Sequence, residues 1–224
     1  LYTFDRKLRL LMLDAVEQIE VAFRVAISER MSIQYDPFWY RDSNHFINIK
    51  RHSDFLEEVA KLINRRKHPL IKHYYETYFS PDFPPSWMLI ECLTFGNWSK
   101  IFHNLKDRKD KKQIAQRFNQ SFKTLGSWII SLIEVRNICA HHERLWNHVF
   151  HYPPKDAPQD VRQQEKFYQQ AYITDQLLQS ISGTSIWKLK LKNLFQEHPT
   201  VPFQQMGFLE DWQNDAFWVI PLKN

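Results

Sequence analysis

The chain has 224 residues, of which 43% are hydrophobic and 15% aromatic, so it carries enough apolar side chains to bury a core and is not a disordered chain. Its formal net charge of +5 is compatible with binding a polyanion such as RNA but does not require it. Its two cysteines, Cys92 and Cys139, are too few for a disulfide framework, which predicts free thiols and a cytoplasmic location.

Helical periodicity is the main signal along the chain, because only four glycines and eleven prolines interrupt it. From Phe4 to about Met31, apolar residues recur every three or four positions, which predicts one long amphipathic helix. Shorter helices are predicted over residues 55–63, 87–93 and 95–105, with Ser86 as the N-cap of the second. Residues 106–112 are predicted to form a highly charged turn.

A second long helix is predicted from about Leu125. Its core-facing residues repeat at spacings of three and four: Leu125, Trp128, Ile129, Leu132, Val135 and Cys139. After a proline-rich connection we predict helices at about 160–182 and 184–196, and then an irregular aromatic tail over 203–218. These elements predict one all-α domain over residues 1–224. No apolar run approaches the roughly 18 residues of a membrane span, so no membrane segment is predicted.

The chain does not begin with Met, and its helical periodicity is already under way by Leu8. We therefore expect that an N-terminal segment is lacking from this sequence.

Polar residues of the second long helix are the candidates for chemistry. Asn137, His141, Arg144 and His148 follow one another at spacings of four, three and four, so on a continuous helix they form one polar stripe. Arg136 lies five residues before His141 and off this stripe, but its long side chain can swing towards a phosphate near the imidazole.

Arginine paired with histidine suits the cleavage of RNA, because the 2′-hydroxyl of RNA is itself the nucleophile and no metal is required. An imidazole can transfer protons near neutral pH, and a guanidinium can bind two phosphate oxygens of the transition state. This assigns proton transfer to His141 and charge stabilisation to Arg136. Asn137 is expected to orient the imidazole or to hold the phosphate.

Two other interpretations of these residues remain open. A buried polar cluster that joins helices would give the same spacing, with Asn137 and His148 hydrogen-bonded structurally. A metal site is the second alternative, because His141, His142, His148 and His151 are close in sequence. No HExxH pattern and no carboxylate at helical spacing completes such a site, so we predict no metal and no other cofactor.

The segment Ser127–Asn147, which contains Glu134-Val135-Arg136-Asn137-Ile138-Cys139-Ala140-His141, resembles the signature of the Abi-like abortive-infection family of the HEPN ribonuclease superfamily. Three further segments agree with this resemblance: Phe4–Arg9 with Ile19–Arg24, Phe95–Trp98 with Asn104-Leu105, and Gly207-Phe208 to Trp212. The resemblance implies an HEPN-like helical bundle with additional helices. It also implies that Arg136, Asn137 and His141 are the motif of a metal-independent endoribonuclease.

The resemblance further implies that two copies of the motif face one another across a homodimer. It implies a role in phage defence or in a toxin–antitoxin pair, with RNA as the substrate and an RNA or a protein as the possible antitoxin. Arg144 and His148 are expected to support RNA binding. Glu20 and Arg24 match a recurrent pair of the family, and a structural ion pair is favoured over a phosphate contact by Arg24.

A non-catalytic module that binds RNA or a partner protein is the alternative function. It is motivated by the basic segment 106–112 and by exposed aromatic residues.

Overall fold

The computed structural model describes residues 1–65, 67–158, 165–183 and 186–218. Within these ranges the protein consists of α-helices and short 3₁₀ helices and contains no β-strand. Phe46 and Leu105 form an isolated antiparallel β-bridge. The all-α prediction is confirmed. None of the described helices is both long and apolar enough to cross a membrane.

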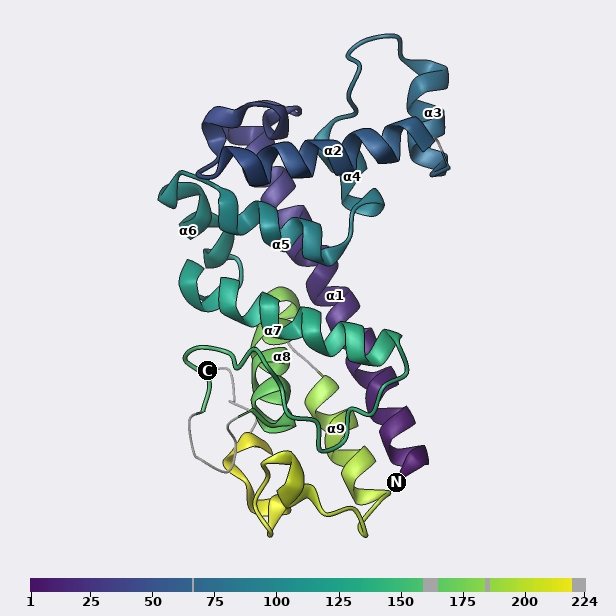
Figure 1. Ribbon diagram of the computed structural model, residues 1–224. Helices are drawn as coiled ribbons and strands as arrows, with labels where there is room; N and C mark the ends of the chain where they lie inside the picture. Colours follow the sequence, from purple (N-terminus) through teal and green to yellow (C-terminus); the bar gives the residue numbers. More distant parts are fainter. Residues whose placement is uncertain (66, 159–164, 184–185, 219–224) are drawn as a thin grey trace. The chain divides into compact units, whose positions relative to one another are not determined.

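The helices form two compact units (Figure 1). The first unit comprises Leu1–Ile19 and the chain from Lys123 onward, and the second comprises Glu20–Phe122. The helix α1 (Tyr2–Gln34) contributes its beginning to the first unit and its remainder to the second. The prediction of a single domain over 1–224 stays a prediction.

The first unit packs the beginning of α1 with α7 (Phe122–Ala140), α8 (Phe167–Ser182) and α9 (Trp187–Gln196). All six residues predicted to form the apolar face of α7 are buried. The helices expected at 160–182 and 184–196 are confirmed as α8 and α9, although residues 160–164 and 184–185 of those predictions lie outside the described residues.

The tail after α9 is irregular and aromatic, as predicted. It forms three 3₁₀ helices, η3 (Phe203–Met206), η4 (Trp212–Asn214) and η5 (Ala216–Trp218). Phe203 stacks on Phe195 of α9 with ring centroids 4.0 Å apart, and Trp218 stacks on Phe208 at 5.8 Å. The tail therefore packs aromatic side chains against Phe195 of α9.

The second unit surrounds Phe23 of α1, whose ring contacts Phe95, Phe102 and Phe118. Two 3₁₀ helices follow α1 in this unit, η1 (Trp39–Arg41) and η2 (Ser43–His45). Five α-helices complete it: α2 (Ile49–Arg65), α3 (Pro69–Thr77), α4 (Ser86–Cys92), α5 (Phe95–Asn104) and α6 (Arg108–Gln116).

Two predictions for the second unit are wrong. Most of the charged segment 106–112 belongs to α6, whose first turn is capped by the Asp107 carboxylate bonded to the N–H of Lys109 at 2.7 Å. Ser86 does not cap α4; it is buried, and its hydroxyl lies 2.8 Å from the hydroxyl of Ser28 and 2.9 Å from that of Ser32. The helix begins at Ser86 itself, with Pro85 in the cap position, and the Ser86 hydroxyl binds two serines of α1 instead.

Candidate active site

The helix α7 ends at Ala140, directly before His141. The N–H of Glu143 donates to the carbonyl of Ile138 at 3.0 Å, and the N–H of His142 donates to that of Cys139 at 3.2 Å. This pair of bonds is a Schellman motif, which requires a left-handed residue at its turn. His142 takes that position with a φ of 59°, where glycine is the usual residue. No glycine or proline therefore marks the end of this helix in the sequence.

Because α7 ends here, the predicted polar stripe along one continuous helix is wrong beyond His141. The N–H of His141 still donates to the carbonyl of Asn137 at 2.9 Å, so these two residues share one face of the last helical turn. Arg144 lies in the following loop, with its guanidinium 6.0 Å from the ring of Trp146. His148 lies farther along the loop and is directed at Glu134 instead.

Arg136, Asn137 and His141 are all exposed at the carboxyl end of α7. Among the described residues, their side chains have no hydrogen-bond or ion-pair partner. The alternative in which Asn137 is hydrogen-bonded in a buried cluster does not agree with this exposure. Three polar groups that can exchange protons and bind phosphate are thus available to a molecule from solution.

The loop after His141 is attached to the beginning of α1. The carboxylate of Asp5 accepts hydrogen bonds from the N–H of Leu145 at 3.0 Å and from that of Trp146 at 2.6 Å. Arg9 pairs with Asp5 one turn along the helix and also donates to the carbonyl of Glu143 at 3.2 Å. Both side chains are about nine-tenths buried, being 10% exposed. Asp5 and Arg9 thus hold the backbone on both sides of Arg144, a role that helical periodicity did not predict.

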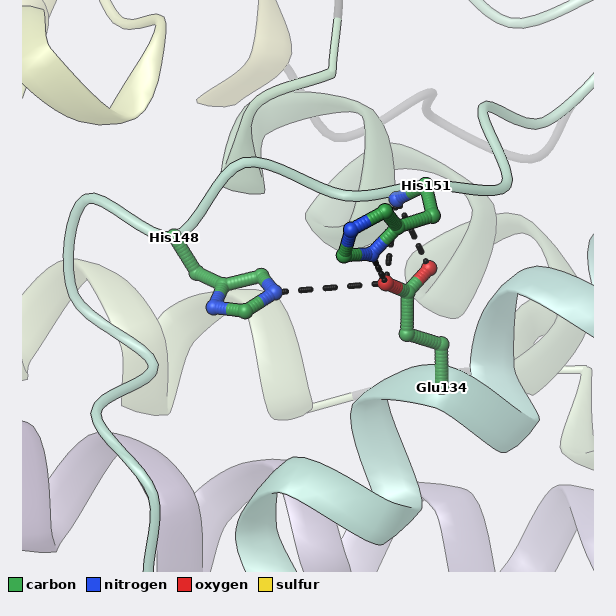
Figure 2. Close-up of side chains that lie close together, drawn as sticks. All are labelled: Glu134, His148 and His151. Atoms are coloured by element: carbon green, nitrogen blue, oxygen red, sulfur yellow. Dashed lines mark hydrogen bonds and ion pairs between the residues drawn. The ribbon is translucent and has the colours of Figure 1, made fainter.

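Glu134 brings together a second group of polar residues (Figure 2). Its Oε1 lies 2.8 Å from Nδ1 of His151 and 3.9 Å from Nε2 of His148. Both of its oxygens also accept from the N–H of His151, and Oε2 accepts from the N–H of Tyr152. The sequence analysis found no carboxylate at helical spacing from the histidines. Folding of the loop onto α7 brings the Glu134 carboxylate to His148 and His151 instead.

Cys139 lies between the candidate residues on α7 but is no candidate nucleophile. Burial raises the pKa of its thiol to about 12, so the thiol is protonated at neutral pH. Burial likewise raises the pKa of Cys92 to about 11. Both cysteines are free, as predicted.

Glu20 and Arg24 belong to the second unit, where they form an ion pair along α1. Arg24 also donates to the carbonyl of Ile90 at 2.8 Å, and both side chains are mostly buried. This geometry agrees with the structural ion pair that the sequence favoured. A phosphate contact by Arg24 stays a prediction.

The sequence profile of the Abi-like protein family matches residues 1–147 of the 224. The match includes the beginning of α1, all of α7 and the loop that Asp5 and Arg9 hold. No curated protein and no solved structure matches the chain.

Proposed function

The chain belongs to the Abi-like protein family, and from this premise we propose that it is a metal-independent endoribonuclease of the HEPN type. Membership suggests abortive-infection phage defence, in which the enzyme acts as a toxin alone or with an RNA or protein antitoxin. The predicted resemblance to the Abi-like family is confirmed by the match over residues 1–147. The nuclease activity, its RNA substrate and the homodimer are parts of this proposal.

In the proposed reaction, the ribose 2′-hydroxyl attacks the adjacent phosphorus while the bond from phosphorus to O5′ breaks. One imidazole accepts the proton of the 2′-hydroxyl, and a second group donates a proton to the departing O5′. The products are a 2′,3′-cyclic phosphate and a 5′-hydroxyl end. Arg136 binds the phosphate oxygens, on which negative charge grows in the transition state. His141 supplies the imidazole, and Asn137 orients the imidazole or the phosphate.

One observation carries the proposal: the side chains of Arg136, Asn137 and His141 are exposed and unpartnered within the described part of the chain. Buried charged groups that stabilise the fold are normally paired, as Asp5 and Arg9 are here, whereas these three exposed groups are free to bind a phosphodiester. The attachment of the loop to α1 limits the motion of the backbone after His141. A restrained backbone that presents free polar groups is what positioning of a phosphodiester requires.

A dimer is part of the proposal because one copy of the motif contains a single imidazole, from His141. Cleavage in line needs a base and an acid on opposite sides of the phosphorus. A second copy of the chain, placed with its own His141 across the phosphodiester, supplies the missing group.

The test is cleavage of RNA by purified protein in an excess of chelator. We expect products that end in a 2′,3′-cyclic phosphate. We expect His141→Ala to slow cleavage by about 10²–10⁴-fold, and Arg136→Ala to slow it by about 10²–10³-fold. His73→Ala serves as the control for histidine loss, because His73 is exposed on α3 of the second unit. Equal cleavage by wild type and by His141→Ala overturns the proposal.

A second candidate function is RNA binding without cleavage. The helix α6 and the residue before its N-cap present a row of exposed cations: Lys106, Arg108, Lys109 and Lys112. Such groups neutralise phosphates without reading sequence, so the resulting affinity falls steeply with salt. This function predicts RNA binding that His141→Ala leaves unchanged, and no cleavage by the wild type.

A further inference from the structure

We infer that Glu134, His148 and His151 form a binding site for a divalent transition-metal ion of the zinc class. The site is separate from the proposed cleavage chemistry, which uses Arg136, Asn137 and His141. It joins the loop that follows the Schellman motif to α7, and it requires neither RNA nor catalysis for its detection.

The first argument is the geometry of the three side chains (Figure 2). Each offers one ligand atom, and these atoms all lie within 4.8 Å of one another. Zinc binds imidazole nitrogen and carboxylate oxygen at about 2.0–2.2 Å in a tetrahedral arrangement, so two of its ligand atoms lie about 3.4 Å apart. The distances of 2.8 Å and 3.9 Å from Glu134 Oε1 to the two imidazoles lie on either side of this value. Small side-chain rotations bring all three atoms onto one ion.

The second argument is a buried nitrogen without a partner. Nε2 of His148 is shielded from solvent and has no hydrogen-bond partner among the described residues. It faces Glu134 Oε1 across 3.9 Å, which is too long for a hydrogen bond. A buried polar atom in this state costs free energy unless something satisfies it. An ion placed between the nitrogen and the carboxylate oxygen satisfies both.

The third argument is the orientation of the carboxylate. Oε2 of Glu134 accepts from the N–H of His151 and from the N–H of Tyr152, each at 3.1 Å. These bonds turn Oε1 towards the two imidazoles. Carboxylates that bind metals are commonly oriented by hydrogen bonds to their other oxygen. The two bonds to Oε2 thus remain in place when Oε1 binds an ion, whereas the N–H of His151, which also donates to Oε1 at 3.0 Å, shares that oxygen with the ion.

The ligand set selects the class of metal. Two imidazoles with one carboxylate favour zinc and its neighbours over magnesium or calcium, which prefer oxygen ligands. Three protein ligands leave a position for water. Glu134 lies two residues before Arg136 on α7, so the ion holds residues 148–151 against the helix that carries the motif.

The experiment measures zinc binding to protein without an affinity tag, stripped with chelator and dialysed into chelator-free buffer. Titration calorimetry with Zn²⁺ is expected to give one ion per chain. The variants Glu134→Gln and His148→Ala/His151→Ala are expected to bind at least about tenfold more weakly, since each removes ligands from the ion. The melting temperature of the wild-type protein is expected to rise when Zn²⁺ is added, whereas that of these variants is expected to stay unchanged.

The matched control is His141→Ala/His142→Asn, which also removes two histidines from this part of the chain. It is expected to bind zinc as the wild type does. Absence of stoichiometric binding by the wild type, or equal loss of binding in the control, overturns the inference. A Co²⁺ absorption spectrum of the wild type gives a second measurement that needs no variant: imidazole coordination is expected, and a spectrum of hydrated Co²⁺ contradicts it. Both assays are independent of RNA cleavage, so the metal site and the proposed function succeed or fail separately.

Discussion

Asp5 illustrates how one side chain links the beginning of the chain to the candidate active site. An acidic residue in the first turn of a helix ordinarily interacts with the helix dipole, at a gain of about 0.3–1 kcal/mol. Here the carboxylate instead caps two backbone N–H groups of the loop after α7, while its charge is paired with Arg9. The first and the last parts of the profile match thus meet in one hydrogen-bonded group.

We predict that Asp5→Ala destabilises the protein by about 3–5 kcal/mol, because it leaves the buried Arg9 charge unpaired and two N–H groups unsatisfied. Urea unfolding followed by circular dichroism measures this loss. Asp14→Ala is the matched control, since Asp14 is an exposed acidic residue of the same helix, and it is expected to stay within about 0.5 kcal/mol of the wild type. A loss of similar size in both variants contradicts the assigned role.

Among the helices, those with an apolar stripe were predicted well. The stripes of α1 and α7 identify their buried faces, because Leu8, Ile19 and Phe23 of α1 and Leu125 and Leu132 of α7 are all fully buried. The amphipathic stripe is dictated by local spacing, so it can be recognised without knowing what packs against it. The helix α3, whose nine residues begin at Pro69, was not predicted.

Helix ends and charged helices were predicted less well, for physical reasons. In α6 only Ile114 and Ala115 are buried apolar residues, so its helical character depends on the Asp107 cap and not on a stripe. The end of α7 has no glycine, since His142 adopts the left-handed conformation itself. Arg136, Asn137 and His141 were proposed from their spacing and from the resemblance to the Abi-like family, whereas the contacts of Glu134 with the loop depend on how the chain folds back.

The helices α8 and α9 of the first unit are joined by a buried ion pair. Nζ of Lys188 lies 2.7 Å from Oδ2 of Asp175, and the side chains are 8% and 2% exposed. Oδ2 also accepts from the amide of Gln179. Burial raises the pKa of Asp175 above its usual 3.8, and the bond to Lys188 only partly offsets this effect. Burial therefore opposes the charged form of the carboxyl even when its partner is present.

We predict that Lys188→Met destabilises the protein by about 3–5 kcal/mol at neutral pH, because the carboxylate loses its partner. The double variant Asp175→Leu/Lys188→Met is expected to lose less than Lys188→Met alone, since no buried charge remains. Denaturant unfolding of the wild type, Lys188→Met, Asp175→Leu and the double variant measures the coupling energy between the two side chains. Additive losses contradict an interaction between these two side chains.

The pH dependence of Lys188→Met follows from the raised pKa of Asp175. A carboxyl whose pKa is higher in the folded state binds its proton more tightly there, so protonation favours folding. Removing Lys188 takes away interactions that lower this pKa, so the folded pKa of Asp175 is higher in the variant than in the wild type. The deficit relative to the wild type is full above the folded pKa of the variant and shrinks as pH falls through it towards the folded pKa of the wild type. Unfolding measured between neutral and mildly acidic pH is therefore expected to show the deficit shrinking relative to the wild type.

At the scale of the whole molecule, the proposal requires two chains to act on one phosphodiester. A single copy supplies the guanidinium of Arg136 and one imidazole, from His141. Symmetric homodimers are the commonest soluble assemblies, and a twofold axis through the site places identical groups on opposite sides of a substrate. A shared site of this kind differs from a dimer of independent sites in how it responds to an inactive partner.

We predict that His141→Ala protein inhibits the wild type when the two exchange chains. If each site needs an imidazole from both copies, then about a tenfold excess of the variant converts nearly all wild-type chains into inactive mixed dimers. The cleavage rate per wild-type chain then falls about tenfold. His73→Ala protein at the same excess is the control, because its mixed dimers retain two copies of His141. Sedimentation verifies that dimers form at the concentration of the assay. A monomer with full activity, or a rate per wild-type chain that the variant leaves unchanged, contradicts the shared site, because each chain then completes the reaction with its own His141.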